Sequence, residues 1–447
     1  MASVCRLDRA TVSAGVTAGA INTLAAVSHP MPPTESIVTL TRELVSIPSH
    51  EDETEAGEFI ESWLRRETDA DVRRDSVGNV FARTGTDGTE GESEGEDEDE
   101  SESETATASG STTGNAATLD GETGDQSAET LALVGHHDVV APAESQTDDD
   151  GAYVVEERNG RLYGRGAADM KGALAAAMLA FRDNEMRRTS EAGTETGDAD
   201  PGGGELVFAS FVGEEVGGTG ARHAIDEGFA PEFAVVGEGS TNYSGSDVTD
   251  VAVAHKGRRG STITAHGSAA HASEVEAGEN AIYRATDAIE TIRGLAPPTV
   301  SVAGETLEGT VAVTEIEGGT AMNVVPDRCE FTIDERTVPG ERAPLADIAD
   351  LPGVEWTIEQ DLPPMRCDDA AFADAVRSAA AAQSGAPELV AKPHATDAGW
   401  LSEAGSECVI YGPAEPGEAH TDDESVSIAV LERCYETYRQ IAAQWPR

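Results

Sequence analysis

Four short apolar runs constrain the fold of this chain more than any other feature of its sequence. They cover residues 131–134, 206–212, 234–236 and 408–411. Each is too short for a buried helix and lacks polar alternation, which is typical of parallel strands covered on both faces. A helical pattern over residues 172–181 lies among them. This alternation predicts an α/β domain with a mostly parallel sheet and helices on both faces.

The pattern changes between residues 251 and about 360. Strands are expected over 251–266, 309–316, 328–336 and 354–358, and helices over 280–293 and 345–351. This β-α-β-β-α-β order is that of the split, ferredoxin-like α+β unit. A chain of 447 residues also exceeds the usual size of a single core. We therefore expect a first domain built from residues 34–248 and 361–447, interrupted by an inserted ferredoxin-like domain over residues 249–360.

Acidic residues outnumber basic ones along the whole chain. There are 84 Asp and Glu against 30 Lys and Arg, for a formal net charge of -54. Residues 84–130 carry 15 of the acids and no base, so we expect a disordered insertion there. The other 69 acids still outnumber the bases. This charge excludes nucleic acid and anionic membranes as partners, and it is typical of halophilic proteins, in which salt screens self-repulsion.

The N-terminal segment and the cysteines bear on localisation. Residues 1–33 precede the first convincing helix and are expected to be a disordered extension or a mis-called start. No apolar run reaches the length of a membrane span. The five cysteines are odd in number and lack C-x-x-C spacing, so we expect reduced thiols in a cytoplasmic protein.

Side chains that commonly bind metals follow each apolar run. They are His136, His137 and Asp138 after the first run, Glu214 and Glu215 after the second, Glu238 after the third, and His420 beyond the fourth. Ligands of open α/β sheets bind at the carboxyl ends of the strands, so these groups should converge. His136 and Asp138 face the same side of an extended segment, which lets Asp138 orient His136. The glycine-rich segment 164–172 places Asp169 where its two oxygens can bridge two cations.

Five separated motifs complete this pattern. They are G-H-x-D at 135–138, G-R-G-x-x-D-M-K-G at 164–172, G-E-E at 213–215, V-G-E at 236–238 and H-T-x-x-E at 420–424. In this order they resemble the zinc metallopeptidases and deacylases that include acetylornithine deacetylase, succinyl-diaminopimelate desuccinylase, aminoacylase and carboxypeptidase G. The resemblance runs from about residue 35 to the end, apart from the acidic insertions.

The resemblance implies a two-metal hydrolase of amino-acid biosynthesis. It assigns His136, Asp169 and Glu238 to one metal, and Asp169, Glu215 and His420 to the other. It also makes Glu214 the general base, and implies a cis peptide bond between Asp169 and Met170. Two histidines with three carboxylates suit two zinc ions, with cobalt or manganese as alternatives.

Further matches to this family lie in the expected inserted domain. His271 in G-S-A-A-H-A resembles a lid histidine that steadies the oxyanion and often comes from the partner subunit, which implies a homodimer formed through this lid domain. Asn323 in N-V-V-P and Arg336 in D-E-R resemble residues that hold the substrate carboxylate. Arginine suits that role because its planar guanidinium binds a carboxylate through two parallel hydrogen bonds.

Three functional readings stay open at this level. The first is removal of a succinyl or acetyl group from an N-acyl amino acid, and the second is a dipeptidase or carboxypeptidase on the same scaffold. The third is a non-catalytic binding protein with the same fold. All six metal-binding and base positions carry competent residues, which disfavours the third reading.

Overall fold

The computed structural model describes residues 33–84, 129–192 and 204–445. The predicted N-terminal extension and the predicted acidic insertion lie outside the described residues, apart from their ends. No helix in the described ranges is both long and apolar enough to cross a membrane.

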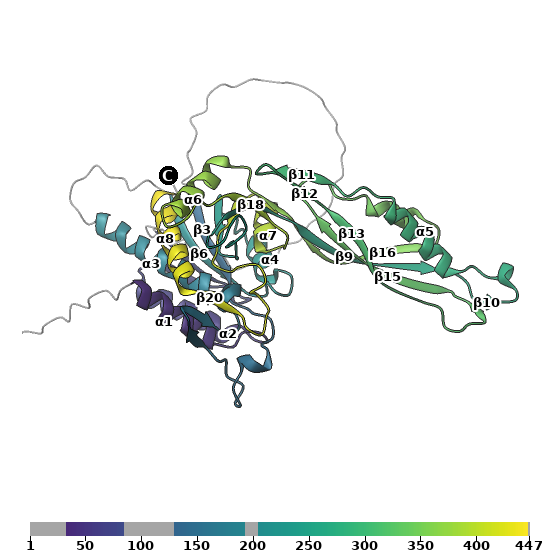
Figure 1. Cartoon of the computed structure of the whole chain (residues 1–447), viewed down its shortest axis with the longest axis horizontal. Helices are drawn as coiled ribbons and strands as arrows, with labels where there is room; N and C mark the ends of the chain where they lie inside the picture. The colour runs from purple at the N-terminus through teal and green to yellow at the C-terminus, as the bar shows by residue number, and fades with distance from the viewer. Residues whose placement is uncertain (1–32, 85–128, 193–203, 446–447) are drawn as a thin grey trace, which may run out of the picture. The chain divides into compact units, whose positions relative to one another are not determined.

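A mixed nine-stranded sheet forms the core of the larger domain (Figure 1). Its order is β1 (Asp71–Arg74), β2 (Val80–Arg83), β6 (Glu205–Phe211), β3 (Thr130–His136), β7 (Phe233–Val236), β19 (Glu407–Ile410), β8 (Val251–His255) and β17 (Met365–Arg366), with β18 (Leu389–Lys392) also paired to β8. The neighbours β6, β3, β7 and β19 run parallel. These are the four apolar runs, so the predicted parallel core is confirmed.

Helices cover both faces of this sheet because its strands alternate two sets of apolar side chains. Leu131 and Leu133 pack in one buried cluster with helices of the first face: α1 (Pro33–Ser46), α2 (Thr54–Glu67), α3 (Gly172–Ala192), α6 (Ala370–Ala381) and α8 (Ile428–Gln444). Ala132 and Val134 pack in a second cluster with α4 (Thr219–Asp226) and α7 (Asp397–Glu403). Each leucine buried in this way stabilises the fold by about 1.5–3 kcal/mol.

A separate antiparallel sheet forms the inserted domain. Its order is β13 (Thr310–Gly318), β15 (Arg328–Thr337), β9 (Gly257–His266) and β16 (Val354–Leu362). Helix α5 (Ala281–Arg293) lies beside this sheet (Figure 1) and shares a buried cluster with it. The side chain of Asn280 caps its N-terminus. The predicted fold class is therefore confirmed.

Two details of the inserted region differ from expectation. The single strand expected over residues 251–266 is two strands, because β8 pairs in the larger sheet and β9 in the smaller one. A hairpin of β11 (Thr299–Val302) and β12 (Glu305–Glu308) was not expected. Its turn places Ala303 and Gly304 at positive φ, and Ala-Gly lacks the asparagine or aspartate that usually signals such a turn.

Candidate metal centre

Three parallel strands deliver their following residues to one edge of the larger sheet. His136 is the last residue of β3, Glu214 and Glu215 follow β6, and Glu238 follows β7. His420 reaches the same region from the loop after β19, with an unusual positive φ of 63°. The predicted convergence at the carboxyl ends of the strands is confirmed.

Asp169 lies between the two histidines. Its Oδ1 is 3.2 Å from His136 Nε2, and its Oδ2 is 3.2 Å from His420 Nε2. The peptide bond between Asp169 and Met170 is cis, as predicted. One carboxylate thus presents a separate oxygen to each imidazole, the arrangement expected of a bridging ligand.

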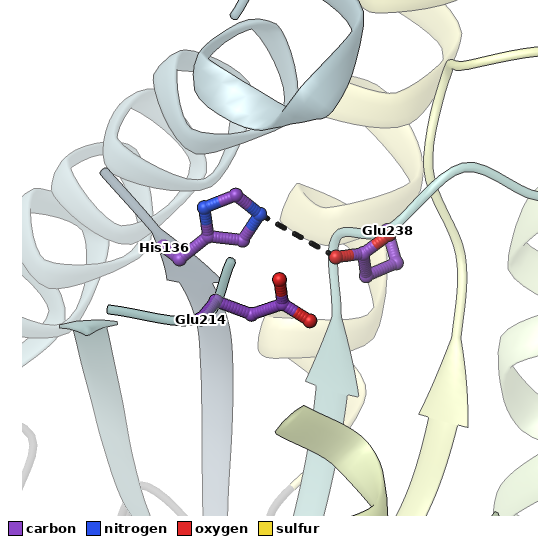
Figure 2. Close-up of side chains that lie close together, drawn as sticks. All are labelled: His136, Glu214 and Glu238. Atoms are coloured by element: carbon purple, nitrogen blue, oxygen red, sulfur yellow. Dashed lines mark ion pairs between the residues drawn. The ribbon is translucent and has the colours of Figure 1, made fainter. Parts of the chain in front are cut away.

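Two groups of side chains could each hold a metal ion. Asp169, Glu215 and His420 form one group, with His420 Nε2 at 2.9 Å from Glu215 Oε1. The other consists of His136, Glu214 and Glu238, and Figure 2 shows their side chains converging. In this group His136 Nε2 is 3.5 Å from Glu238 Oε1. Glu214 therefore stands where the sequence assignment has Asp169, although Asp169 remains close to His136.

Asp138 supports this arrangement through contacts with three residues of the cluster. Its Oδ1 accepts a hydrogen bond from the Glu214 backbone N–H at 3.1 Å, and its Oδ2 accepts one from the Glu215 N–H at 3.0 Å. The same Oδ1 is 3.3 Å from His136 Nδ1. The backbone carbonyl of Asp138 lies 3.0 Å from the same ring nitrogen. Asp138 therefore fixes one histidine ring through its carbonyl and its carboxylate, and the carboxylate also holds the turn that carries both glutamates.

Glu424 supports the Asp169 segment and received no role from the sequence. Its Oε1 accepts hydrogen bonds from the backbone N–H groups of Ala168 and Asp169, at 3.0 and 3.1 Å. Its other oxygen pairs with the buried Arg165 at 2.5 Å. Glu424 is the last residue of the H-T-x-x-E motif, and that position was the only signal that could have revealed it.

The electrostatics of the cluster follow from burial and from these contacts. Burial raises the pKa of Glu214 well above its usual range, with partial opposition from His136. Burial also acts to raise the pKa of Asp169, but hydrogen bonds from His136 and His420 outweigh it and lower that pKa. Hydrogen bonds to Asp169 and Glu215 raise the pKa of His420 to about 10. Protons on the histidines thus occupy places that cations can take, so metal binding should release protons.

A cavity of about 320 Å³ opens onto the cluster. Its walls include Asp169, Glu214, Glu215, Glu238, Tyr243, Lys392, His394, Thr396, Glu415 and His420. Lys392 is buried, with Nζ 3.6 Å from Glu238 Oε2. Asp397 is also buried, and neither of its carboxylate oxygens has a hydrogen-bond partner in the described part of the chain.

The residues predicted in the inserted domain do not line this cavity. His271 and Asn323 are exposed and lie beside the short pairing of β10 (Ala270–His271) with β14 (Val324–Val325), where the Ala272 N–H donates to the Asn323 carbonyl at 2.9 Å. The His271 ring is 2.7 Å from Ser273 Oγ. Arg336 is half-buried, and its Nε donates to Asp334 Oδ1 at 2.8 Å. The roles predicted for these three residues stay predictions.

Comparisons with known proteins agree with the geometry of the site. The model of peptidase family M20/M25/M40 matches residues 132–444. Acetylornithine deacetylase of Myxococcus xanthus is 31% identical over 338 residues, which cover 72% of this chain and 81% of that protein. Succinyl-diaminopimelate desuccinylase of Bordetella avium is 26% identical over 335 residues, covering 69% of this chain and 82% of that protein.

Solved structures show the same fold at lower identity. Aminopeptidase PepT from Bacillus cereus matches with a TM-score of 0.67 at 19% identity, covering 92% of this chain and 98% of that structure. A dinuclear metal-binding peptidase of the M20 family from Bacillus subtilis matches with a TM-score of 0.60 at 16% identity, covering 92% and 98%.

Proposed function

This chain belongs to peptidase family M20/M25/M40 and is a metallohydrolase that acts on amide bonds, and we propose that it removes a succinyl or acetyl group from an N-acyl amino acid. The observation that carries the two-metal hydrolysis is the position of Asp169, with one carboxylate oxygen toward His136 and the other toward His420. Support for a deacylase comes from the sequence identities of 31% to an acetylornithine deacetylase and 26% to a succinyl-diaminopimelate desuccinylase.

The donor set fits a pair of divalent cations. His136, Glu238 and Asp169 would hold one, and Asp169, Glu215 and His420 the other. Two imidazoles with three carboxylates suit zinc, with cobalt or manganese as alternatives. Such a pair, when bound, lowers the pKa of a water molecule and polarises the amide carbonyl.

Glu214 is the residue best suited to move the proton. It makes no ion pair among the described residues, whereas Glu215 pairs with His420 and Glu238 pairs with His136. Its carboxylate lines the cavity, and its backbone N–H is held by Asp138. Glu214 would accept a proton from water and donate it to the leaving amine.

The remaining roles concern the substrate and the assembly. Arg336 and Asn323 would hold the carboxylate of the amino acid, and His271 would steady the oxyanion from the partner subunit of a homodimer. The acidic composition supports a halophilic enzyme, for which we infer a salt-rich cytoplasm.

A second candidate function is a dipeptidase or carboxypeptidase. It is favoured by the TM-score of 0.67 to an aminopeptidase, and the same base and ligands would serve a peptide bond. A hydrolysis panel at high salt with added zinc or cobalt separates the two candidates. It compares N-succinyl-diaminopimelate, N-acetylornithine, N-acetylmethionine and dipeptides, and hydrolysis of dipeptides alone would reject the deacylase.

A further inference from the structure

The lining of the cavity includes a buried lysine, although the chain as a whole is strongly acidic. Lys392, one of only three lysines in the sequence, ends β18 and lines the cavity, with 5% of its surface exposed. His394 lines the cavity as well. Burying a lysine without an acidic partner destabilises the folded state, so Lys392 needs a negatively charged partner at this position.

The partner within this chain is shared with the metal cluster. Lys392 Nζ lies 3.6 Å from Glu238 Oε2, while Glu238 Oε1 lies 3.5 Å from His136. Once Glu238, Asp169 and Glu215 hold divalent cations, their negative charges are compensated by those ions. Lys392 then keeps a positive charge that Glu238 alone no longer balances.

Lys392 is the one lysine or arginine among the described residues that line this cavity. Arg336, proposed for the first carboxylate, lies outside this lining and pairs with Asp334. A positive charge in the lining favours a ligand that carries a negative charge there.

We propose that Lys392 binds a second carboxylate of the substrate, beyond the one proposed for Arg336. This inference rests on the proposed deacylase function and narrows it to N-acyl amino acids with two carboxylates. The second carboxylate belongs either to the acyl group, as in an N-succinyl amino acid, or to the side chain of an N-acylated aspartate or glutamate. An ammonium group with three donors suits either source, because it does not demand the planar geometry that arginine does.

A structural role is the alternative reading of the same contact. In that reading Lys392 serves solely to hold Glu238, so its loss affects every substrate equally and lowers metal content. A subsite for a carboxylate instead predicts a change in the preference between substrates. The two readings are separated by the ratio of kcat/KM values for paired substrates, measured together with metal content.

The experiment uses the zinc-loaded full chain at high salt and two matched substrate pairs. N-succinyl-alanine is compared with N-butyryl-alanine, and N-acetylaspartate with N-acetylasparagine. If Lys392 makes a buried charge-assisted contact, the kcat/KM of the wild type should be roughly 10- to 100-fold higher for the dicarboxylate in one of the two pairs. The pair that shows this preference tells whether the second carboxylate belongs to the acyl group or to the side chain. Lys392→Met should bring the ratio of kcat/KM values within that pair close to one, and Lys392→Arg should retain part of the preference. Lys256→Met is the control: it removes the same charge beside this strand and should leave the ratio unchanged.

The possible outcomes separate a failure of the Lys392 proposal from a failure of the proposed deacylase function. Equal kcat/KM values for both members of each pair in the wild type would overturn the inference and leave the deacylase intact. An unchanged preference in Lys392→Met, or an equal loss for both members of a pair with lower metal content, would also overturn it. No hydrolysis of any N-acyl amino acid by the two-metal wild type would reject the proposed function and this inference with it.

Discussion

Substituting Asp138 with asparagine tests how the metal centre is held together. The Asp138 carboxylate accepts two backbone hydrogen bonds, from Glu214 and Glu215, and lies 3.3 Å from His136 Nδ1. Burial acts to raise the pKa of Asp138, but His136 and the two backbone N–H groups lower it below its usual value, so the ionised form is favoured. Asparagine has one acceptor oxygen and places an NH₂ donor where the second acceptor was.

The expected losses follow from these contacts. A buried backbone N–H left without an acceptor costs about 1–3 kcal/mol of unfolding free energy. The variant keeps the Asp138 backbone carbonyl, 3.0 Å from His136 Nδ1, but loses the carboxylate charge 3.3 Å from the same nitrogen. Partial loss of the group that orients a histidine ligand should lower metal affinity by about 10-fold, the lower end of the usual range. Chemical unfolding of the metal-free chain at constant high salt measures the first effect, and zinc titration against a chromophoric chelator measures the second.

Asp148→Asn is the matched control. Asp148 is exposed, and it accepts backbone hydrogen bonds from Asp150 and Ala152 at 2.9 and 3.0 Å, as many as Asp138 accepts. The Asp148→Asn variant should keep nearly the wild-type free energy of unfolding and the full wild-type zinc affinity. Wild-type zinc affinity in Asp138→Asn, or an equal loss of affinity in Asp148→Asn, would refute the role given to Asp138.

Two other predictions concern acid stability and assembly. Burial lowers the pKa of His255 to about 3. Between pH 6.5 and 3 the unfolded chain therefore binds a proton at His255 that the folded chain does not bind. The free energy of unfolding should fall as the pH falls through this window. In His255→Asn the slope of unfolding free energy against pH should be smaller than in the wild type by about 1.4 kcal/mol per pH unit. Identical slopes in the two proteins would contradict this prediction. If His271 acts across a homodimer, mixing inactive His271→Ala and Glu214→Ala chains should restore some activity. No recovery despite demonstrated subunit exchange would count against that role.

The position of the metal site could be predicted because it depends on strand direction alone. Parallel strands end at one edge of a sheet, so His136, Glu215 and Glu238 had to converge once β3, β6 and β7 were recognised. The bridging role predicted for Asp169 came from the glycine-rich segment 164–172 and from the family resemblance, and its two carboxylate oxygens lie 3.2 Å from His136 Nε2 and from His420 Nε2.

The supporting contacts could not be predicted because they join distant segments. Glu424 binds the backbone of Asp169 across 255 residues of sequence, and no local pattern encodes that approach. Lys392 became a candidate only when its burial and its distance to Glu238 were known. The division of β8 from β9 was hidden because only Lys256 separates the two strands, and the sheet that each joins is set by partner strands elsewhere in the chain.

Metal content measured together with turnover tests the central claim most directly, because adjacent glutamates are assigned different tasks. Glu214→Gln keeps its size but cannot accept a proton, so it should retain two metals per chain while turnover falls by about 10²–10⁴. Glu215→Gln removes a charged ligand and should lower metal content, with activity partly restored by excess metal. Loss of metal in Glu214→Gln with full occupancy in Glu215→Gln would contradict the account.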